Sequence, residues 1–432
     1  MKYVLIILMA LIPAICTAET RVLTLDQAIS IAMEKNRDIE KAREYARYVQ
    51  GKYVEERAAA LPQLSLNGSV LVSKDASNQV AGFPAQRLFG RAVDLTLSQP
   101  LYTWGKLGAA IRAAEVGLKT ADEQLRQFRQ AAYRDVVTAY CDVQLAKEFS
   151  RLAQENRSQK LRHLDEATRK FSAGVATDYD VLAAEVAAEN MLPEVIRSEN
   201  NVRMARERLR FLLAMGSDEV DTAGRMEPAT DGSGVPPSYD EAMRVAEKRR
   251  PELNDLRLRI GIYDELVTIA NADNKPRLDL KGGAGWRWAN LNDPGPAMNA
   301  DGAAWNIGLY VTFPFFDGLR TSGRIAQANS DLRTKQIEVA RLIDSISLEV
   351  RQAEFSYHEA TEIVKALFGT VAQAERLVQM AEKGYEFGVK IRLEVDDAQL
   401  NLLQARSNLA KAHRDFRVAQ ANYLWAIGVV GE

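Results

Sequence analysis

The chain contains two copies of one pattern, and the second copy follows the first at a constant offset of 214 residues, from Thr24 to Ser238. The offset holds without a gap almost to the C-terminus. Matched segments include Thr24-Leu25-Asp26-Gln27-Ala28 with Ser238-Tyr239-Asp240-Glu241-Ala242, Pro62 with Pro276, Pro100 with Pro314, and Gly174-Val175 with Gly388-Val389. Solenoid repeats have periods of only about 20–50 residues, so a whole structural unit is duplicated here. Two such units predict a pseudo-symmetric assembly.

The N-terminal segment has the features of a secretory signal peptide. An apolar run over residues 4–12 is followed by small residues that end at Ala18, where we expect cleavage, so that residues 1–18 are removed. The run is too short to span a bilayer as a helix. Acylation of Cys16 is the alternative, and the bulky Ile15 before it disfavours that alternative.

The composition excludes several classes of function. After cleavage one cysteine remains, Cys141, so an internal disulfide is not expected. The three histidines have no metal-ligand spacing with it, and we expect neither a metal nor another cofactor. No nucleophile–base pair or phosphate loop is recognisable, so we expect no enzyme. A net charge of −2 argues against a nucleic-acid partner. No mature segment is a long uncharged apolar run, which excludes a helical membrane protein but not a β-barrel.

Each copy predicts the same order of elements. A capping box, Thr24 to Gln27 and Ser238 to Glu241, opens a helix that we expect to run to about Ala60 or Asn274. A β-hairpin follows, over residues 62–99 and 276–313, and then a long helical hairpin, over residues 105–213 and 319–428. The first repeat is expected to occupy residues 19–216 and the second repeat residues 238–432. Residues 217–237, which are rich in Gly, Pro and Asp, are expected to form a linker or equatorial segment between them.

Alternation with a period of two gives each predicted hairpin an apolar and a polar face. In the first copy Leu64, Leu66 and Val70 alternate with Ser65 and Asn67. The corresponding apolar positions of the second copy are Leu278, Leu280, Ala284, Trp286, Trp288, Trp305, Ile307, Leu309, Val311 and Phe313.

The long helices show apolar residues in steps of three and four, without proline. Read from Gly105 to about Phe171, the first helix is about 65 residues, or about 100 Å at 1.5 Å per residue. A pattern sustained over this length predicts coiled-coil-like packing. Gly174 and Gly388 then end the two helices at tight turns, and return helices follow. Pro193 is expected to kink the first return helix, whereas its counterpart is Ser407.

Four strands of about 8–12 residues are long enough to cross an outer membrane, but a four-stranded sheet cannot close on itself. Because open edges cannot face lipid, several chains would have to pool their strands. Two chains would give eight strands and three would give twelve, and the strand count leaves both open. A soluble sheet packed on helices is the other possibility. Membrane insertion explains the aromatic residues as two girdles: Trp286, Trp288 and Trp305 near the loop ends of the strands, and Tyr102, Phe315 and Phe316 at the other ends.

Taken in order, these motifs resemble the TolC family of outer-membrane efflux proteins over essentially the whole mature chain. The motifs that carry the resemblance are Thr24-Leu25-Asp26-Gln27-Ala28, Leu61-Pro62-Gln63-Leu64, Gln99-Pro100-Leu101-Tyr102-Thr103-Trp104-Gly105 with Phe313-Pro314-Phe315-Phe316-Asp317-Gly318, and Phe171-Ser172-Ala173-Gly174-Val175 with Tyr385-Glu386-Phe387-Gly388-Val389. The resemblance implies a mainly α fold with membrane β-strands. It also implies a homotrimer with a 12-stranded barrel in the outer membrane and a helical tunnel in the periplasm. Such a protein is an exit duct for efflux or type I secretion, working with an inner-membrane transporter and a periplasmic adaptor.

The resemblance also implies a gate at the helical turns. Glu394 and Asp397 correspond to the family's acidic ring, and Asp180 to an acidic partner held by Lys390 and Tyr385. Like carboxylates around a three-fold axis would favour cations. Lys390 stands where the family more often has Arg, so bidentate pairing is lost, and Arg392 could pair with Glu394 or Asp396. Solvated charges at a turn are the simpler explanation of these residues. For the whole chain, the alternative is a periplasmic coiled-coil adaptor.

Overall fold

The computed structural model describes residues 21–74, 87–224, 238–292 and 298–430. Its chain divides into two compact units. Unit 1 takes in Met1–Arg43, Leu125–Pro251 and Ile343–Glu432, and unit 2 takes in Glu44–Gln124 and Glu252–Leu342. The predicted cleavage after Ala18 and the alternative at Cys16 lie outside the described residues.

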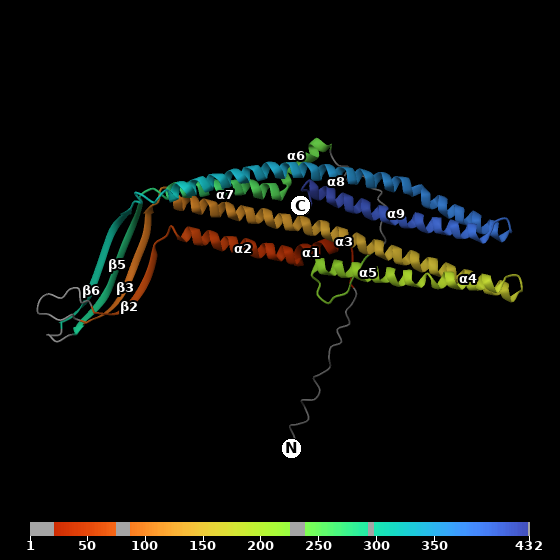
Figure 1. Ribbon diagram of the computed structural model, residues 1–432, viewed down its shortest axis with the longest axis horizontal. Helices are drawn as coiled ribbons and strands as arrows, with labels where there is room; N and C mark the ends of the chain where they lie inside the picture. Colours follow the sequence, from red (N-terminus) through yellow and green to blue (C-terminus); the bar gives the residue numbers. More distant parts are fainter. Residues whose placement is uncertain (1–20, 75–86, 225–237, 293–297, 431–432) are drawn as a thin grey trace, which may run out of the picture. The chain divides into compact units, whose positions relative to one another are not determined.

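The two copies form matching series of elements, labelled in Figure 1. The first copy comprises β1 (Arg21–Leu23), α1 (Leu25–Lys35), α2 (Arg37–Ala58), β2 (Gln63–Lys74), β3 (Arg87–Tyr102), α3 (Lys106–Ser172), α4 (Asp178–Glu189), α5 (Leu192–Leu213) and β4 (Val220–Thr222). The second comprises α6 (Tyr239–Arg249), α7 (Pro251–Ala272), β5 (Arg277–Asn292), β6 (Met298–Thr312), α8 (Arg320–Glu386) and α9 (Arg392–Ala426). The helices α3 and α8 have 67 residues each, which agrees with the length that the periodicity predicts.

The first helix of each copy is interrupted, and the single helix predicted up to Ala60 or Asn274 is therefore wrong in this detail. The breaks fall at Asn36 and Arg250, which are 214 positions apart. The Asn36 side-chain oxygen accepts hydrogen bonds from the N–H groups of Asp38 (2.9 Å) and Ile39 (3.3 Å), so this residue caps α2. At the second break Pro251 occupies the first position of α7, where its missing N–H costs nothing.

The residue at each break also donates a hydrogen bond to the C-terminal end of the return helix. Asn36 Nδ2 donates to the carbonyl of Leu212 at 2.9 Å, near the end of α5. Arg250 Nη1 donates to the carbonyl of Ala426 at 3.2 Å, the last residue of α9. Leu212 and Ala426 are again 214 positions apart, so chemically different residues form the same joint in both copies. The free carbonyls at a helix C-terminus explain why a donor is needed there.

The two predicted capping boxes have different outcomes. At Thr24 the box is confirmed: the Gln27 N–H donates to Thr24 Oγ1 at 3.3 Å, and the Thr24 N–H donates to Gln27 Oε1 at 3.0 Å. At Ser238 the prediction is wrong, because the side chain makes no capping hydrogen bond. There the backbone carbonyl of Ser238 accepts from the N–H groups of Glu241 and Ala242, both at 2.9 Å, and these bonds close the first turn of α6.

The strands of unit 2 form one antiparallel sheet in the order β2-β3-β5-β6 (Figure 1). Its register aligns the apolar positions of neighbouring strands: Leu64 lies opposite Leu97, Leu97 opposite Gly282, and Gly282 opposite Ile307. Strand β3 continues to Tyr102, three residues beyond the predicted hairpin boundary at residue 99. An irregularity between Pro100 and Tyr102 accommodates the proline, which has no N–H to donate.

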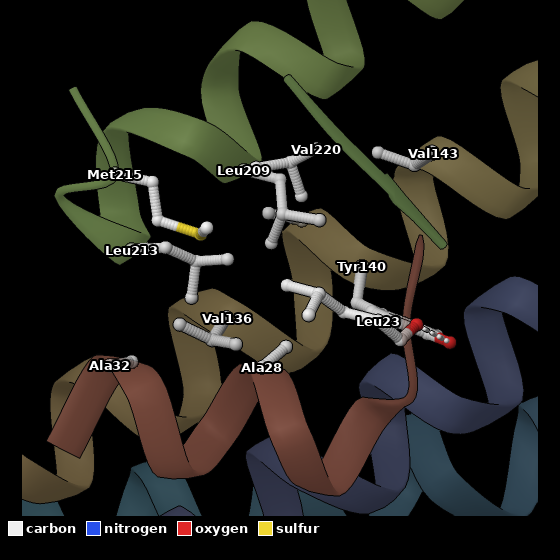
Figure 2. Packing of buried hydrophobic residues seen from close by; sticks show 11 residues of the cluster. Leu23, Ala28, Ala32, Val136, Tyr140, Val143, Leu209, Leu213, Met215 and Val220 are labelled. Carbon is white, nitrogen blue, oxygen red and sulfur yellow. Dashed lines mark hydrogen bonds between the residues drawn. The ribbon is translucent and has the colours of Figure 1, made fainter. Parts of the chain in front are cut away.

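The main core of unit 1 joins α1, α3 and α5. Figure 2 shows Ala28 and Ala32 of α1 facing Val136 of α3, with Leu209 and Leu213 of α5 above them. Beside this core β1 pairs in parallel with β4, and the Tyr140 hydroxyl lies 3.1 Å from the carbonyl oxygen of Leu23. Val220–Thr222 thus form a strand inside residues 217–237, the predicted linker or equatorial segment, where the sequence indicated no strand. Three residues are too few to show a strand pattern.

The return helices differ as the proline predicts. In the first copy the helix is broken between Glu189 and Leu192, and Pro193 lies in the first turn of α5, where its missing N–H leaves no intrahelical bond unmade. In the second copy α9 runs without interruption through Ser407. Pro193 therefore separates two helices rather than kinking one.

Candidate functional site

The sheet of unit 2 presents one apolar face formed by all four strands. Leu66 of β2, Leu95 of β3, Ala284 of β5 and Trp305 of β6 lie in one row across it. These side chains are exposed in the single chain, Leu66 to 73%. Other exposed apolar residues of the same face are Leu64, Val70, Val72, Val93, Trp286, Ile307, Leu309 and Val311. A continuous apolar surface of this kind is suited to contact with hydrocarbon rather than water.

The opposite face of the sheet is polar. Thr96 Oγ1 lies 2.6 Å from Ser65 Oγ and accepts from Asn67 Nδ2 at 3.2 Å. Further along, Arg287 approaches Asp94 at 3.6 Å, and the Lys281 ammonium lies 5.3 Å from the centre of the Tyr310 ring. A depression of about 640 Å³ is lined by Asn67, Asp94, Thr96, Lys281, Arg287 and Tyr310. The face is therefore suited to water, and the two faces together match the alternation of a membrane strand.

The aromatic residues expected at two girdles are spread more evenly than predicted. Trp288 lies four residues before the end of β5, but Trp305 is the central residue of β6 and pairs with Ala284. The prediction that Trp305 lies near the loop end is wrong, because β6 extends further toward the loop than the sequence indicated. Trp286 pairs with Ala303 and also lies well inside its strand. At the other end Tyr102, Phe315 and Phe316 are exposed.

The helical turns of unit 1 have the same geometry in both copies. Gly174 has φ +76° and Gly388 has φ +72°, a conformation that glycine adopts without the steric cost of a Cβ. In the first turn the N–H of Gly174 donates to Phe171 O (2.9 Å) and the N–H of Val175 to Lys170 O (2.9 Å). The equivalent bonds in the second turn are Gly388 to Tyr385 (3.1 Å) and Val389 to Gly384 (2.8 Å). Both turns are Schellman motifs.

Asp180 and Glu394, which occupy the same position in the two copies, act alike at the start of the return helices. Asp180 Oδ2 accepts from the Thr177 N–H at 2.8 Å, and Glu394 Oε2 accepts from the Ile391 N–H at 3.1 Å. The N–H and hydroxyl of Thr177 lower the pKa of Asp180. The pKa of Glu394 is lowered by Lys390, and further by the Ile391 N–H.

Lys390 donates to Glu394, its neighbour one turn along α9, and not to Asp180. The Lys390 stem lies across Gly384, where a Cβ would come within 2.7 Å of Lys390 Cγ. A bond between Lys390 and Asp180 is not formed within the described chain. Asp397 is exposed and makes no ion pair with any described residue. Of the two expected ring carboxylates, Glu394 is therefore partly neutralised and Asp397 is not.

A second group of charges lies between the two turns, around a cavity of about 510 Å³ that Asp180 and Tyr385 help to line. Lys170 Nζ lies 3.3 Å from the Tyr385 hydroxyl and 2.7 Å from Glu166. Glu166 first, and then Tyr385, raises the pKa of Lys170. These contacts place Tyr385 of α8 against α3.

The same cavity contains an ion pair that spans α3 and α9. Lys160 of α3 pairs with Asp396 of α9 at 2.7 Å, and Arg392 approaches Asp396 at 3.4 Å. The pairing of Arg392 with Asp396 was one of the two alternatives from the sequence. The Lys160 contact was not foreseen, because a lysine on the polar side of a long helix has no local signal.

Within residues 21–74, 87–224, 238–292 and 298–430 there is no group of three or more His, Cys, Asp or Glu side chains placed to hold a metal ion. None of the described helices is long and apolar enough to cross a membrane.

One sheet with a lipid-compatible face, to which each copy of the repeat contributes two strands followed by a long helical hairpin, defines the class of outer-membrane channel-forming proteins. Residues 28–215 and 242–429 match the model of the family described as outer membrane efflux protein. The two matches cover most of the sequence, and the chain belongs to this family.

Individual relatives agree with this assignment. The chain is 23% identical over 382 residues to the outer membrane protein TolC of Vibrio cholerae, covering 87% of this chain and 84% of the relative. It is 24% identical over 380 residues to the alkaline protease secretion protein AprF of Pseudomonas aeruginosa, covering 87% and 78%. The outer membrane channel CmeC of Campylobacter jejuni superposes with a TM-score of 0.80 at 17% identity, over 94% of this chain and 85% of that one.

The family assignment confirms the predicted fold, function and location. The protein is an outer-membrane channel for efflux or type I secretion, and it extends from the outer membrane into the periplasm. The alternative of a periplasmic adaptor has no support, because the family match covers both copies of the repeat and the structural neighbours are channels.

Proposed function

We propose that three copies of this chain pool their strands into a 12-stranded barrel and their helices into a tunnel. Each of the two repeats, residues 19–216 and 238–432, contributes one β-hairpin and one helical hairpin. The observation that carries the proposal is the sheet itself. Among the described residues it has four strands, its outer strands β2 and β6 each have an unpaired edge, and one of its two faces is apolar and exposed. Such edges cannot remain unpaired in lipid.

The stoichiometry is tested by native mass spectrometry of the protein extracted in mild detergent. A mass of three chains supports the proposal. A dimer, which would give eight strands, or a monomer would overturn it. Disulfide cross-linking of cysteines introduced into β2 and β6 then tests the contact itself, because a cross-link between chains requires these two edges to meet.

We further propose that the residues at the two helical turns gate the tunnel. Glu394 and Asp397 would form acidic rings around the three-fold axis, and Asp180 would be held by Lys390 of a neighbouring hairpin. Lys390 has a competing partner in Glu394 of its own helix. A single lysine then divides its charge between closing the tunnel and neutralising the ring, because one ammonium cannot fully pair with both carboxylates.

Planar-bilayer recording tests this gate. Lys390→Ala should raise the closed-state conductance and increase cation selectivity, because Glu394 loses its cation. Asp180→Asn should raise the conductance as well, while its amide oxygen still accepts from the Thr177 N–H. The matched control is Lys365→Ala, which removes an exposed lysine paired with Glu362 at 2.8 Å on α8. Unchanged conductance in both gate variants would refute the gate.

The protein works, in this proposal, with an inner-membrane transporter and a periplasmic adaptor that open the turns. It contributes no enzymatic chemistry of its own. One relative is an alkaline protease secretion protein and another a fusaric acid resistance protein, so relatives at similar identity are named for different cargoes. Chemical cross-linking in cells followed by purification tests the partnership. Recovery of the channel without an adaptor under conditions of active export would contradict it.

A further inference from the structure

His163 lies in the contact between the two helical hairpins at the turns, on the wall of the 510 Å³ cavity. It belongs to α3 and reaches α9, where Gln399 Nε2 lies 3.3 Å from His163 Nε2. Its other ring nitrogen, Nδ1, is 3.9 Å from a carboxylate oxygen of Glu166. None of the gate residues expected from the sequence accounts for this histidine.

The Gln399 side chain fits a neutral His163. With its amide N–H₂ toward the ring, Gln399 donates to Nε2, which can accept only when it carries no proton. The same amide group lies 3.4 Å from Glu382 Oε1 of α8. Gln399 Oε1 is buried and has no hydrogen-bond partner among the described residues. A protonated ring would turn Nε2 into a donor facing a donor, and the amide would have to rotate away from Glu382 to restore the bond.

The charges around His163 come from every element packed against it. On α3 they are Lys160, Glu166 and Lys170; on α9, Arg392 and Asp396; on α8, Glu382 and Tyr385; and on α4, Asp180. Asp396 already forms an ion pair with Lys160 at 2.7 Å, and Glu166 forms one with Lys170 at 2.7 Å. A new positive charge on His163 would therefore meet carboxylates that already have cations.

Protonation would act on contacts that join the hairpins. An imidazolium competing for Glu166 would weaken the hold of Glu166 on Lys170, which in turn contacts Tyr385 of α8. It would also be repelled by Arg392 and Lys160. Burial lowers the pKa of His163, and Arg392 and then Lys160 lower it further, which agrees with a packed state that favours the neutral ring.

We propose that His163 is a pH-sensitive joint: its protonation loosens the contact between the α3–α4 and α8–α9 hairpins. The consequence for the channel, easier opening at acidic pH, rests on the gate proposed above. The sign follows from linkage. A packed state that prefers the neutral histidine is fully stabilised above the unperturbed pKa of about 6.5, and it loses stability as the pH falls below that value.

The joint is tested by hydrogen exchange of the intact trimer at pH 7.5 and pH 5.5, corrected for intrinsic rates. Peptides covering residues 160–187 and 382–399 should exchange about threefold faster or more at the lower pH. His163→Gln, which cannot be protonated, should abolish the difference. His163→Lys should show fast exchange at both pH values. The matched control is His358→Gln on α8, an exposed histidine, which should behave as the wild type.

Hydrogen exchange tests the proposed joint, and the conductance of the same variants tests the proposed gate separately. A pH difference that persists in His163→Gln, or that is absent from the wild type, overturns the joint. A difference that depends on His163 supports it. When the conductance of the same variants is recorded, loosening without any rise in conductance would leave the joint standing and count against the gate.

Discussion

Replacing Arg250 by alanine tests the joint that holds the end of α9. The Arg250 side chain is only 4% exposed, and its guanidinium donates to the carbonyl of Ala426 at 3.2 Å. The same group lies 4.6 Å from the centre of the Trp425 ring and 2.8 Å from Glu349. Two of these contacts hold the last turn of α9, at Ala426 and Trp425, and the third ties the guanidinium to Glu349 of α8.

The expected loss can be estimated from these contacts. A hydrogen bond from a charged donor contributes about 1.5–3 kcal/mol, and a largely desolvated cation–π contact about 0.5–2 kcal/mol. Glu349 is one-third exposed and can regain water, so its lost ion pair adds little. Together the change should lower the free energy of opening the last turn of α9 by about 3 kcal/mol, a factor of about 100 in the opening equilibrium.

Native-state hydrogen exchange measures this opening directly. The amides of Ile427, Gly428 and Val429 donate to Tyr423, Trp425 and Leu424, and they should exchange about 100-fold faster in Arg250→Ala. Lys365→Ala, which removes an exposed cation from α8, is the control and should leave these amides unchanged. Exchange within about threefold of the wild type would refute the reasoning, because the joint would then contribute under about 1 kcal/mol.

Three further predictions follow from the repeat and the core. Asn36→Ala should lower the free energy of opening the end of α5 and the start of α2 by about 1–2 kcal/mol, less than in Arg250→Ala because the lost hydrogen bonds are uncharged. Hydrogen exchange of the amides around Leu213 measures this change, and an effect equal to that of Arg250→Ala would contradict it. Gly388→Ala should destabilise the turn by about 1–2 kcal/mol. Gly369→Ala, inside α8 with no atom near its Cβ, should instead stabilise the helix by about 0.5–1 kcal/mol. Thermal dissociation should therefore be faster in Gly388→Ala and slower in Gly369→Ala, and shifts of the same sign would contradict both predictions. Cys141 is 3% exposed, and its pKa is raised to about 11, chiefly by burial. A maleimide should therefore label it at pH 7 only when the chain is unfolded. Rapid labelling of the folded protein would show that α3 and α9 do not pack over this thiol.

The elements whose periodic pattern continues over many residues were predictable from the sequence. The alternation of Leu64 and Leu66 with Ser65 and Asn67 identified the strand and its apolar face, because a period of two has one structural meaning over eight or more residues. The uninterrupted pattern from Gly105 to Phe171 gave the length of α3 to within a few residues. Pro62 and Pro276 marked the change from helix to strand in both copies.

The joints were not predictable, because they depend on contacts between distant residues. Asn36 and Arg250 occupy the same position in the repeat but differ in chemistry, so the offset alone did not single them out. The contact of Lys160 with Asp396 joins helices 236 positions apart in the sequence. At the proposed gate the resemblance implied Asp180 as the partner of Lys390. The pairing of Lys390 with Glu394 of its own helix was not foreseen, because it depends on the conformation of the turn.

The central claim, that the apolar face of the sheet lies against lipid, is tested most directly by spin labels placed along the strands of the trimer in bilayers. Collision rates with oxygen, which concentrates in lipid, and with a water-soluble nickel complex are measured at each site. If the apolar face lies against lipid, oxygen access is expected at Leu66, Val70, Ile307 and Leu309, and nickel access at Asn67, Ser69, Asn306 and Gly308. Access should therefore alternate between the two reagents from each residue to the next along a strand. Equal nickel access on both faces would contradict it.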